Sequence, residues 1–140
     1  MTGSDSDSIT IPSSPDMIAA VDTFLEDWLR EKGVPEDTIA DLAIAVTELV
    51  NNAIKHGNRQ DSDKKVTISL SFQKNEVRAC VSDEGKGFDP ENIPDPLAEE
   101  NLLKEIGRGI FIVKSLMDDF KCSCSLRGGT RIIITKKIAI

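Results

Sequence analysis

Three polar side chains that could take part in chemistry recur every four residues along one predicted helix: Glu48, Asn52 and His56. Apolar residues at helical spacing predict that this helix runs from Glu36 to about His56, and residues four apart lie in one line along it. Core packing requires no carboxylate, amide or imidazole there, and asparagine is a mediocre helix former. The line indicates either a functional face or, as the alternative, a solvated polar face that ends in a capping histidine.

A second group follows directly after a predicted strand, in the segment Asp83-Glu84-Gly85-Lys86-Gly87. A carboxylate at the end of a strand can accept a hydrogen bond from an exocyclic amine. Because Gly85 and Gly87 have no Cβ, a planar ligand can approach the backbone closely. Taken alone, the segment is more simply an ordinary glycine-rich turn, because the pattern is short and common.

Two further glycine pairs lie nearer the C-terminus. Gly107-Arg108-Gly109 is expected to open a helix from about Gly109 to Asp119, where exposed backbone N–H groups and the helix dipole favour a phosphate. The segment lacks the Gly-Lys-Ser/Thr of a P-loop and the βαβ unit of a dinucleotide-binding fingerprint. Gly128-Gly129-Thr130 leads into the last predicted strand, and a hairpin turn is its simplest interpretation.

The elements that must position these residues follow from hydrophobic periodicity. The stretch from Asp83 to about Ile106 fits no period and, at that length, is expected to be functional or mobile. The order β-α-α-β-β-loop-α-β-β predicts an α/β two-layer sandwich, with helices on one face of a mixed, mostly antiparallel sheet. The expected helices are 15–33, 36–56 and 109–119, and the expected strands are 9–11, 66–72, 77–82, 120–126 and 130–138.

Composition limits the possible classes of function. The chain has 140 residues, which fits one domain, with 1–8 expected as a flexible tail and 9–140 as the folded domain. Its 17 Lys and Arg against 24 Asp and Glu give a net charge of −7, which argues against a general binder of DNA or RNA. No apolar run approaches the ~20 residues of a membrane span, and the N-terminus lacks the apolar core of a secretory signal. Three cysteines, an odd number, are most simply reduced thiols in the cytoplasm.

In this order and at these intervals, the four segments resemble the GHKL (Bergerat-fold) ATPase superfamily, although each is a weak signal by itself. The resemblance extends from about Ile9 to Ile138, almost the whole chain. The superfamily's four boxes correspond to Glu48–Gly57, Asp83–Gly87, Gly107–Gly109 and Gly128–Thr130.

Within the superfamily, the chain looks most like the bacterial anti-sigma-factor serine/threonine kinases. The likeness rests on the segments 11–15 (IPSSP), 47–57 (TELVNNAIKHG) and 115–119 (SLMDD). The size matches a stand-alone kinase of this type, whereas gyrase-, MutL- and Hsp90-like relatives need further domains. A sensor histidine kinase needs a phosphoacceptor histidine on a dimerisation helix pair, and the sole histidine here, His56, lies within the nucleotide box.

The resemblance implies that ATP and Mg²⁺ bind between the second helix, the Asp83 loop and a lid that includes Pro90 to Pro96. Asn52 would coordinate Mg²⁺ through its side-chain oxygen. Glu48, one helical turn earlier, would accept the proton of an attacking serine hydroxyl. Asp83 would accept a hydrogen bond from the adenine amino group, with the hydroxyl of Thr130 in support.

Further roles are implied for the remaining box residues. Gly85 and Gly87 would line the base, and Gly107, Arg108 and Gly109 would offer donors to the phosphates. His56 would either bond a phosphate or cap the helix. The candidate cations for the γ-phosphate are Lys55, Lys104 and Arg108.

The resemblance also implies the partners. The expected substrate is a serine or threonine of a STAS-type anti-anti-sigma factor, the expected binding target is an alternative sigma factor, and members commonly form homodimers. Direct binding to nucleic acid or to a membrane is not expected, and the expected location is the cytoplasm. The alternative is a non-catalytic nucleotide-binding regulatory module that binds a partner protein without phosphoryl transfer.

Overall fold

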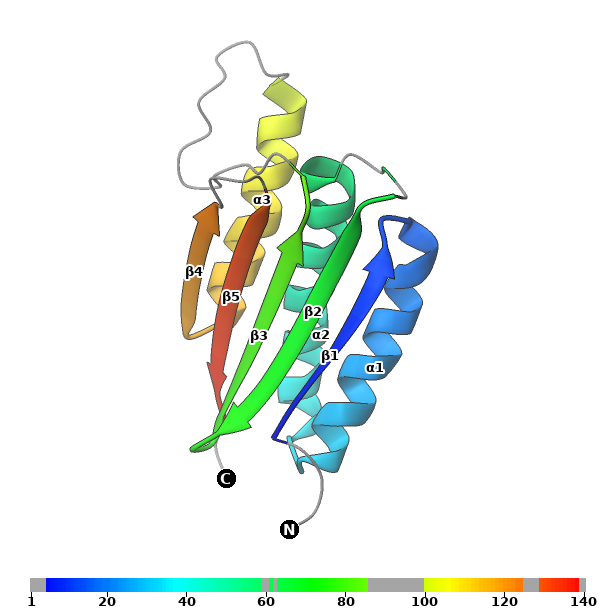
Figure 1. Cartoon of the computed structure of the whole chain (residues 1–140). Coiled ribbons are helices and arrows are strands. Elements are labelled where there is room, and N and C mark those ends of the chain that lie inside the picture. The colour runs from blue at the N-terminus through cyan, green and yellow to red at the C-terminus, as the bar shows by residue number, and fades with distance from the viewer. Residues whose placement is uncertain (1–4, 59–60, 62, 86–99, 125–128, 139–140) are drawn as a thin grey trace.

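The computed structural model describes residues 5–58, 61, 63–85, 100–124 and 129–138, with the backbone alone at 56–57, 100–106 and 124. The chain alternates short runs of strands and helices (Figure 1). The elements are β1 (Ser6–Pro12), the 3₁₀ turn η1 (Pro15–Met17), α1 (Ile18–Glu31), α2 (Glu36–Asn52), the π-helical turn η2 (Ala53–Gly57), β2 (Lys65–Gln73), β3 (Glu76–Asp83), α3 (Glu100–Leu116), β4 (Asp119–Cys124) and β5 (Thr130–Lys137).

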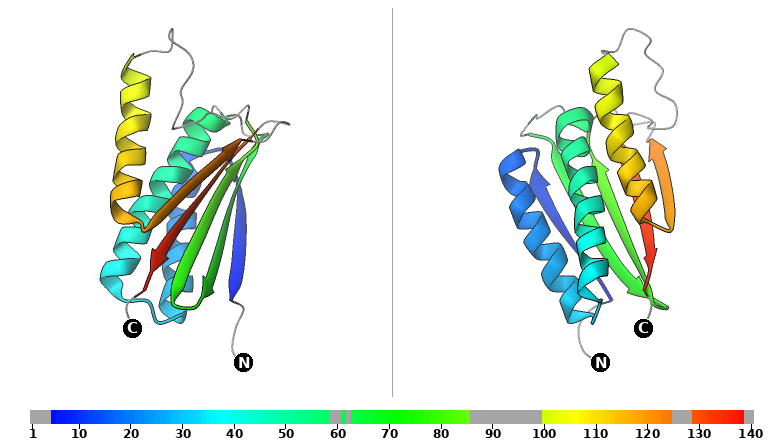
Figure 2. Two further views of the ribbon diagram at one scale, coloured as in Figure 1. Left: turned by 90° about the vertical axis from the view of Figure 1, so that its left-hand side faces the viewer. Right: turned by 180° about the vertical axis from the view of Figure 1, so that it is seen from behind.

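The strands form one sheet in the order β1-β2-β3-β5-β4. The three α-helices lie together on one face of it, and none of the described helices covers the other face (Figure 2). The predicted two-layer α/β sandwich is therefore confirmed. The sheet is not mixed, because each pairing of the described strands is antiparallel. Along the described residues, no helix has both the length and the apolar character needed to cross a bilayer.

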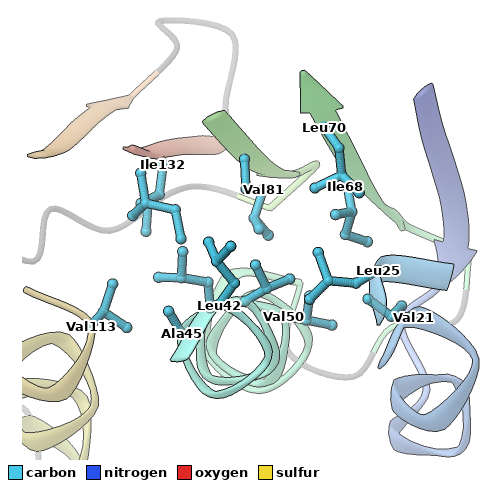
Figure 3. Close-up of a cluster of buried hydrophobic side chains, with 14 of the residues drawn as sticks. Val21, Leu25, Leu42, Ala45, Val50, Ile68, Leu70, Val81, Val113 and Ile132 are labelled. Atoms are coloured by element: carbon cyan, nitrogen blue, oxygen red, sulfur yellow. The ribbon is translucent and has the colours of Figure 1, made fainter. Parts of the chain in front are cut away.

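The core lies between the sheet and α2, the central helix. In β2, the buried residues Val66, Ile68 and Leu70 alternate with partly exposed hydroxyl residues, so one face of the strand is apolar. Across the interlayer space, Ile68 and Leu70 lie toward Val50 of α2 and Leu25 of α1 (Figure 3). Burial of each such side chain stabilises the fold by roughly 1.5–3 kcal/mol. The rotation of α2 about its own axis is fixed as a result, and so is the direction in which its polar residues point.

Two tight turns set the connections around this core. At the end of α1, Gly33 has a φ of +78°, and the N–H of Val34 donates to the carbonyl of Leu29 over 3.1 Å, which is the Schellman arrangement. Between β2 and β3, Lys74 and Asn75 have φ values of 53° and 60°, as a two-residue type I′ hairpin turn requires. The predicted helix end at Gly33 and the predicted hairpin are both confirmed.

The first strand is longer than the sequence predicted. It begins at Ser6 rather than Ile9, and Ser6 and Ser8 pair with Ser71 and Ser69 of β2, so residues 6–8 belong to the sheet and not to a tail. The hydroxyl side chains of this strand point away from the helices. Thr10 and Thr67 illustrate this, because their Oγ1 atoms lie 3.2 Å apart on the open face. In the sequence, the small polar residues at 6–8 resemble a flexible tail. In the structure they form part of an edge strand.

The third helix was predicted incorrectly at its start. It runs from Glu100 to Leu116, so it begins about nine residues before the expected start at Gly109 and ends before Asp119. Residues 100–105 are mostly good helix formers, and the periodic signal was present in the sequence. The apolar residues that carry it, three and four apart, are Leu103, Ile106, Ile110, Val113 and Met117.

Candidate functional site

The residues singled out by the sequence gather at one end of the sandwich. The C-terminal end of α2, the end of β3, the start of β5 and the start of α3 all lie at the upper end in Figure 1. β3 also contacts both α2 and η2 there. This end therefore carries Asn52, Asp83 and Thr130, which are far apart in the sequence.

Asn52 is a polar residue buried at the end of α2. Only 3% of its surface is exposed, and its Nδ2 has no hydrogen-bond partner among the described residues. Leaving such an amide unpaired costs about 1–3 kcal/mol, so its presence calls for an explanation such as a ligand. Rotation of the amide exchanges its nitrogen and oxygen, so this position can present an oxygen to a cation. The helix also changes to the π-helical turn η2 directly after Asn52, a deviation that is frequent at functional sites.

Glu48 lies one helical turn before Asn52, half-buried in the wall of an open groove of about 360 Å³ between the helices. Among the described lining residues, Glu48 alone is ionisable, and several of the others are apolar. The side chains of Ile44 and Ile112 are exposed although they are large and apolar. The lining consists of Ile18, Ile44, Thr47, Glu48, Asn51 and Ile112.

The position of the Glu48 carboxylate depends on a glycine of α3. A Cβ placed at Gly109 would lie 2.8 Å from Oε1 of Glu48 and 3.0 Å from its Cδ, whereas one placed at Gly107 would meet nothing within 4 Å. The absence of a side chain at residue 109 therefore leaves the Glu48 carboxylate in its place against α3, and a Cβ there would push the carboxylate aside. The two glycines of the same short motif thus have different roles.

This difference predicts that alanine substitutions at the two glycines change stability by different amounts. Gly107→Ala should raise the free energy of unfolding by about 1 kcal/mol, because alanine is the better helix former. Gly109→Ala should gain less or lose stability, because its methyl group must displace the Glu48 side chain. Urea denaturation of both variants measures the difference. Equal gains would show that α3 does not rest on Glu48.

Asp83 ends β3 with its carboxylate held from two sides. Its Oδ1 accepts the N–H of Gly85 over 3.0 Å and the N–H of Thr130 over 3.1 Å. Burial raises the pKa of the Asp83 carboxyl above its ordinary value, and these two hydrogen bonds counteract part of that rise. The result is a desolvated carboxylate in a fixed orientation, which suits specific recognition of a donor group on a ligand.

A close backbone approach holds β5 against this carboxylate. Gly129 has a φ of +95°, and a Cβ at this position would lie 2.5 Å from the carbonyl oxygen of Asp83. Only glycine allows that contact. Gly129 therefore brings the N–H of Thr130 within reach of Asp83, and Thr130 itself is buried.

The structure does not place every predicted site residue. Gly87 lies outside the described residues, and His56 is described by its backbone alone, as part of η2. Gly85 is buried beside Asp83, and Arg108 is exposed on α3.

The prediction that Gly107-Arg108-Gly109 opens a helix is wrong. The three residues lie within α3, seven to nine positions after its first residue, where backbone N–H groups bond to carbonyls of the preceding turn. A helix N-terminus that could bind a phosphate is therefore absent at these positions. The error arose because the glycine at 109 was taken for the helix start.

Sequence reasoning also missed Asn58. The sequence analysis assigned no role in the site to this residue, but its side chain is buried and bonded to Ser13, Lys65 and Glu84. These partners lie on three different elements or their ends. An asparagine after a glycine at a helix end is common, so no local signal distinguished this residue.

Comparison with known proteins identifies the family. Residues 11–136 match the histidine kinase-like ATPase domain. The serine-protein kinase RsbW of Oceanobacillus iheyensis is 27% identical over 135 residues, which cover 92% of this chain and 84% of the relative.

Solved structures agree on the fold. The RsbU and RsbW domains of Rv1364c from Mycobacterium tuberculosis match with a TM-score of 0.72 at 23% identity, over 96% of this chain and 33% of that one. The SiaB–SiaC complex from Pseudomonas aeruginosa matches with a TM-score of 0.68 at 11% identity, over 92% of this chain and 88% of that one. The resemblance to the GHKL kinases is thereby confirmed, and the chain belongs to the histidine kinase-like ATPase domain family.

Proposed function

We propose that the protein is an ATP-dependent serine/threonine protein kinase that also acts as an anti-sigma factor. The observation that carries this proposal is the pair on α2. A half-buried glutamate lies in an open groove, and one turn later comes a buried asparagine whose Nδ2 has no hydrogen-bond partner among the described residues. The name of the relatives, serine-protein kinase RsbW, supports the same reaction.

ATP is proposed to bind at the end of the sandwich where α2, β3 and β5 meet. Both described bonds to the Asp83 carboxylate go to Oδ1, so Oδ2 is the atom proposed to accept the adenine amino group. Gly85 adds no side chain beside it, which leaves room for a flat ring. Thr130 is proposed to support the carboxylate from β5 through its hydroxyl, in addition to its N–H.

Mg²⁺ is proposed to be held by the side-chain oxygen of Asn52. Among the described residues, no three His, Cys, Asp or Glu side chains converge as a metal-binding cluster. This fits magnesium, which often takes one protein oxygen and completes its shell with phosphate oxygens and water. When bound, the ion would neutralise phosphate charge and align the phosphates.

The phosphates require positive charge as well. Arg108 and Lys55, both exposed, are the proposed cations among the described side chains, and Lys104 and His56 remain candidates from the sequence. Because the N–H groups of Gly107 and Gly109 lie within α3, the proposed phosphate contact of this motif is the guanidinium of Arg108.

Glu48 is proposed to act as the general base. Its carboxylate would accept the proton of the acceptor hydroxyl while that oxygen forms its bond to the γ-phosphorus of ATP. The bond from this phosphorus to the β,γ-bridging oxygen breaks in the same step, and ADP leaves. A positioned base contributes about 10²- to 10⁴-fold to the rate, and alignment and charge neutralisation supply the rest. The groove around Glu48 is open and apolar at its rim, so a loop of another protein can reach it.

The proposed phosphoacceptor is a serine or threonine of a STAS-type anti-anti-sigma factor, and the proposed target of sequestration is an alternative sigma factor. A cytoplasmic homodimer is the proposed state of the protein, without direct contact to nucleic acid or membrane. The structural relative solved as the SiaB–SiaC complex is itself bound to a protein partner, which supports partner binding on this fold.

A single experiment tests this function. The tagged protein is incubated with lysate of its host in ATP and then in ADP, and phosphosites are mapped on the proteins that co-purify. We expect one STAS-domain protein to acquire a single phosphorylated serine or threonine in ATP, and partner occupancy to change with the nucleotide. Partner capture without any phosphosite would favour the non-catalytic binding module instead.

A further inference from the structure

We propose that Asn58 is a positioning residue for nucleotide selectivity, which fixes the loop that carries Asp83 although it does not touch the ligand. This inference rests on the proposed binding of the adenine base by Asp83. It assigns a role to a buried side chain that lies outside the four sequence boxes.

Both polar atoms of the Asn58 side chain form hydrogen bonds. Its Oδ1 accepts the N–H of Glu84 over 2.8 Å, while its Nδ2 donates to Oγ of Ser13 over 2.7 Å and to the carbonyl of Lys65 over 2.9 Å. Only 1% of the residue is exposed. The backbone N–H of Glu84 requires an acceptor and the carbonyl of Lys65 requires a donor, so the orientation of the amide is unambiguous.

A continuous chain of hydrogen bonds passes through this amide. Ser13, also buried, donates from Oγ to the carbonyl of Lys64 over 2.8 Å and accepts from Asn58. The end of β1, the start of β2, the end of η2 and the end of β3 are thereby joined at the upper end of Figure 1. A satisfied buried network of this kind holds its members in one arrangement.

The network acts on Asp83 through its neighbour. Glu84 is held at both ends, since its N–H bonds to Asn58 and its side-chain Oε1 accepts the N–H of Lys65. The path of the backbone after β3 is therefore fixed at Glu84, which lies between Asp83 and Gly85 in the chain. Asn58 directly follows η2, the turn that continues α2 beyond Asn52, so it links the part of the site proposed to bind the metal to the part proposed to bind the base.

A merely structural bond would affect stability without affecting base selectivity, so the test measures both. Calorimetry compares the affinities for ADP and for inosine diphosphate, which carries a carbonyl in place of the adenine amino group. In the wild type, ADP should bind more tightly. In Asn58→Ala, we expect ADP binding to weaken about tenfold and the ratio of the two affinities to fall toward one.

Ser13→Ala is the matched control. It removes a buried hydroxyl of the same network but leaves the bond between Asn58 and Glu84, so it should lose stability and keep the wild-type ratio. Asn58→Asp keeps the acceptor for Glu84 and loses the amide donors, so it too should keep most of the selectivity. If Asn58→Ala does not fold, Asn58→Leu takes its place, because it fills a similar volume without an acceptor and should lower the ratio in the same way.

The outcomes separate this inference from the proposed function. A wild-type protein that binds neither nucleotide, or both equally, would overturn the assignment of Asp83. A selective wild type with an unchanged ratio in Asn58→Ala, or with selectivity lost in Asn58→Asp, would overturn the role of Asn58 alone.

Discussion

Glu48→Gln should reduce phosphoryl transfer to the acceptor protein by about 10²- to 10⁴-fold, the usual contribution of a general base. The amide has nearly the shape of the carboxylate but cannot take the proton of the attacking hydroxyl. Nucleotide affinity should change by less than about threefold, because Glu48 faces the groove and is not a proposed ligand of the base or the metal. Single-turnover transfer from radiolabelled ATP measures the rate, and calorimetry measures the binding.

The same substitution elsewhere provides the control. Glu31 is exposed at the end of α1, so Glu31→Gln should transfer phosphate at the wild-type rate. The transfer rate of Gly109→Ala should lie between those of Glu48→Gln and Glu31→Gln, because its methyl group displaces the Glu48 carboxylate without removing it. Gly107→Ala should transfer phosphate at the wild-type rate. Undiminished transfer in Glu48→Gln would exclude Glu48 as the base and leave the groove as a docking surface only.

Asn52→Ala should weaken binding of Mg·ATP at least about tenfold, while metal-free ADP binding changes little. Removal of the one proposed protein ligand leaves the metal with phosphate oxygens and water alone. The same variant should be as stable as the wild type or more stable. It removes a buried amide whose Nδ2 has no partner among the described residues, and it adds a better helix former. Together the two effects should raise the free energy of unfolding by about 1 kcal/mol.

A gain in stability together with a loss of binding is the signature of a residue kept for function. The neighbouring Asn51 is the matched control, since it is only partly buried and lines the groove instead. Asn51→Ala should show the gain in helix propensity without the loss of metal dependence. If Asn52→Ala bound Mg·ATP and ADP as the wild type does, the metal assignment would be wrong.

Local periodicity predicted most of the fold. The alternation in β2 and β3, the apolar stripe of α2 and the turn residues Gly33 and Asn75 each specify their element within a few residues. The start of α3 was missed because a glycine pair was given more weight than a clear three-four spacing of apolar residues. β1 was shortened because serines on the outer side of an edge strand, with an exposed aspartate between them, look like a disordered tail.

The site was predictable only in part, and the reason is distance along the chain. Glu48 and Asn52 are one helical turn apart, so the sequence reveals their common side. The contact of Gly109 with Glu48 and the bonds of Asn58 to Ser13 and Glu84 join residues brought together by the tertiary fold. Likewise, the motif of Gly107 and Gly109 suggested backbone donors to phosphates. In the structure, Gly109 instead allows α3 to pack against the Glu48 carboxylate.

The most direct measurement is a crystal structure of the protein with Mg²⁺ and a non-hydrolysable analogue of ATP. The account predicts that the adenine amino group lies against the Asp83 carboxylate, that the metal is bound to the side-chain oxygen of Asn52, and that Glu48 faces the terminal phosphate across the groove. A nucleotide bound elsewhere, or a metal ion with Asn52 turned away from it, would contradict the central claim.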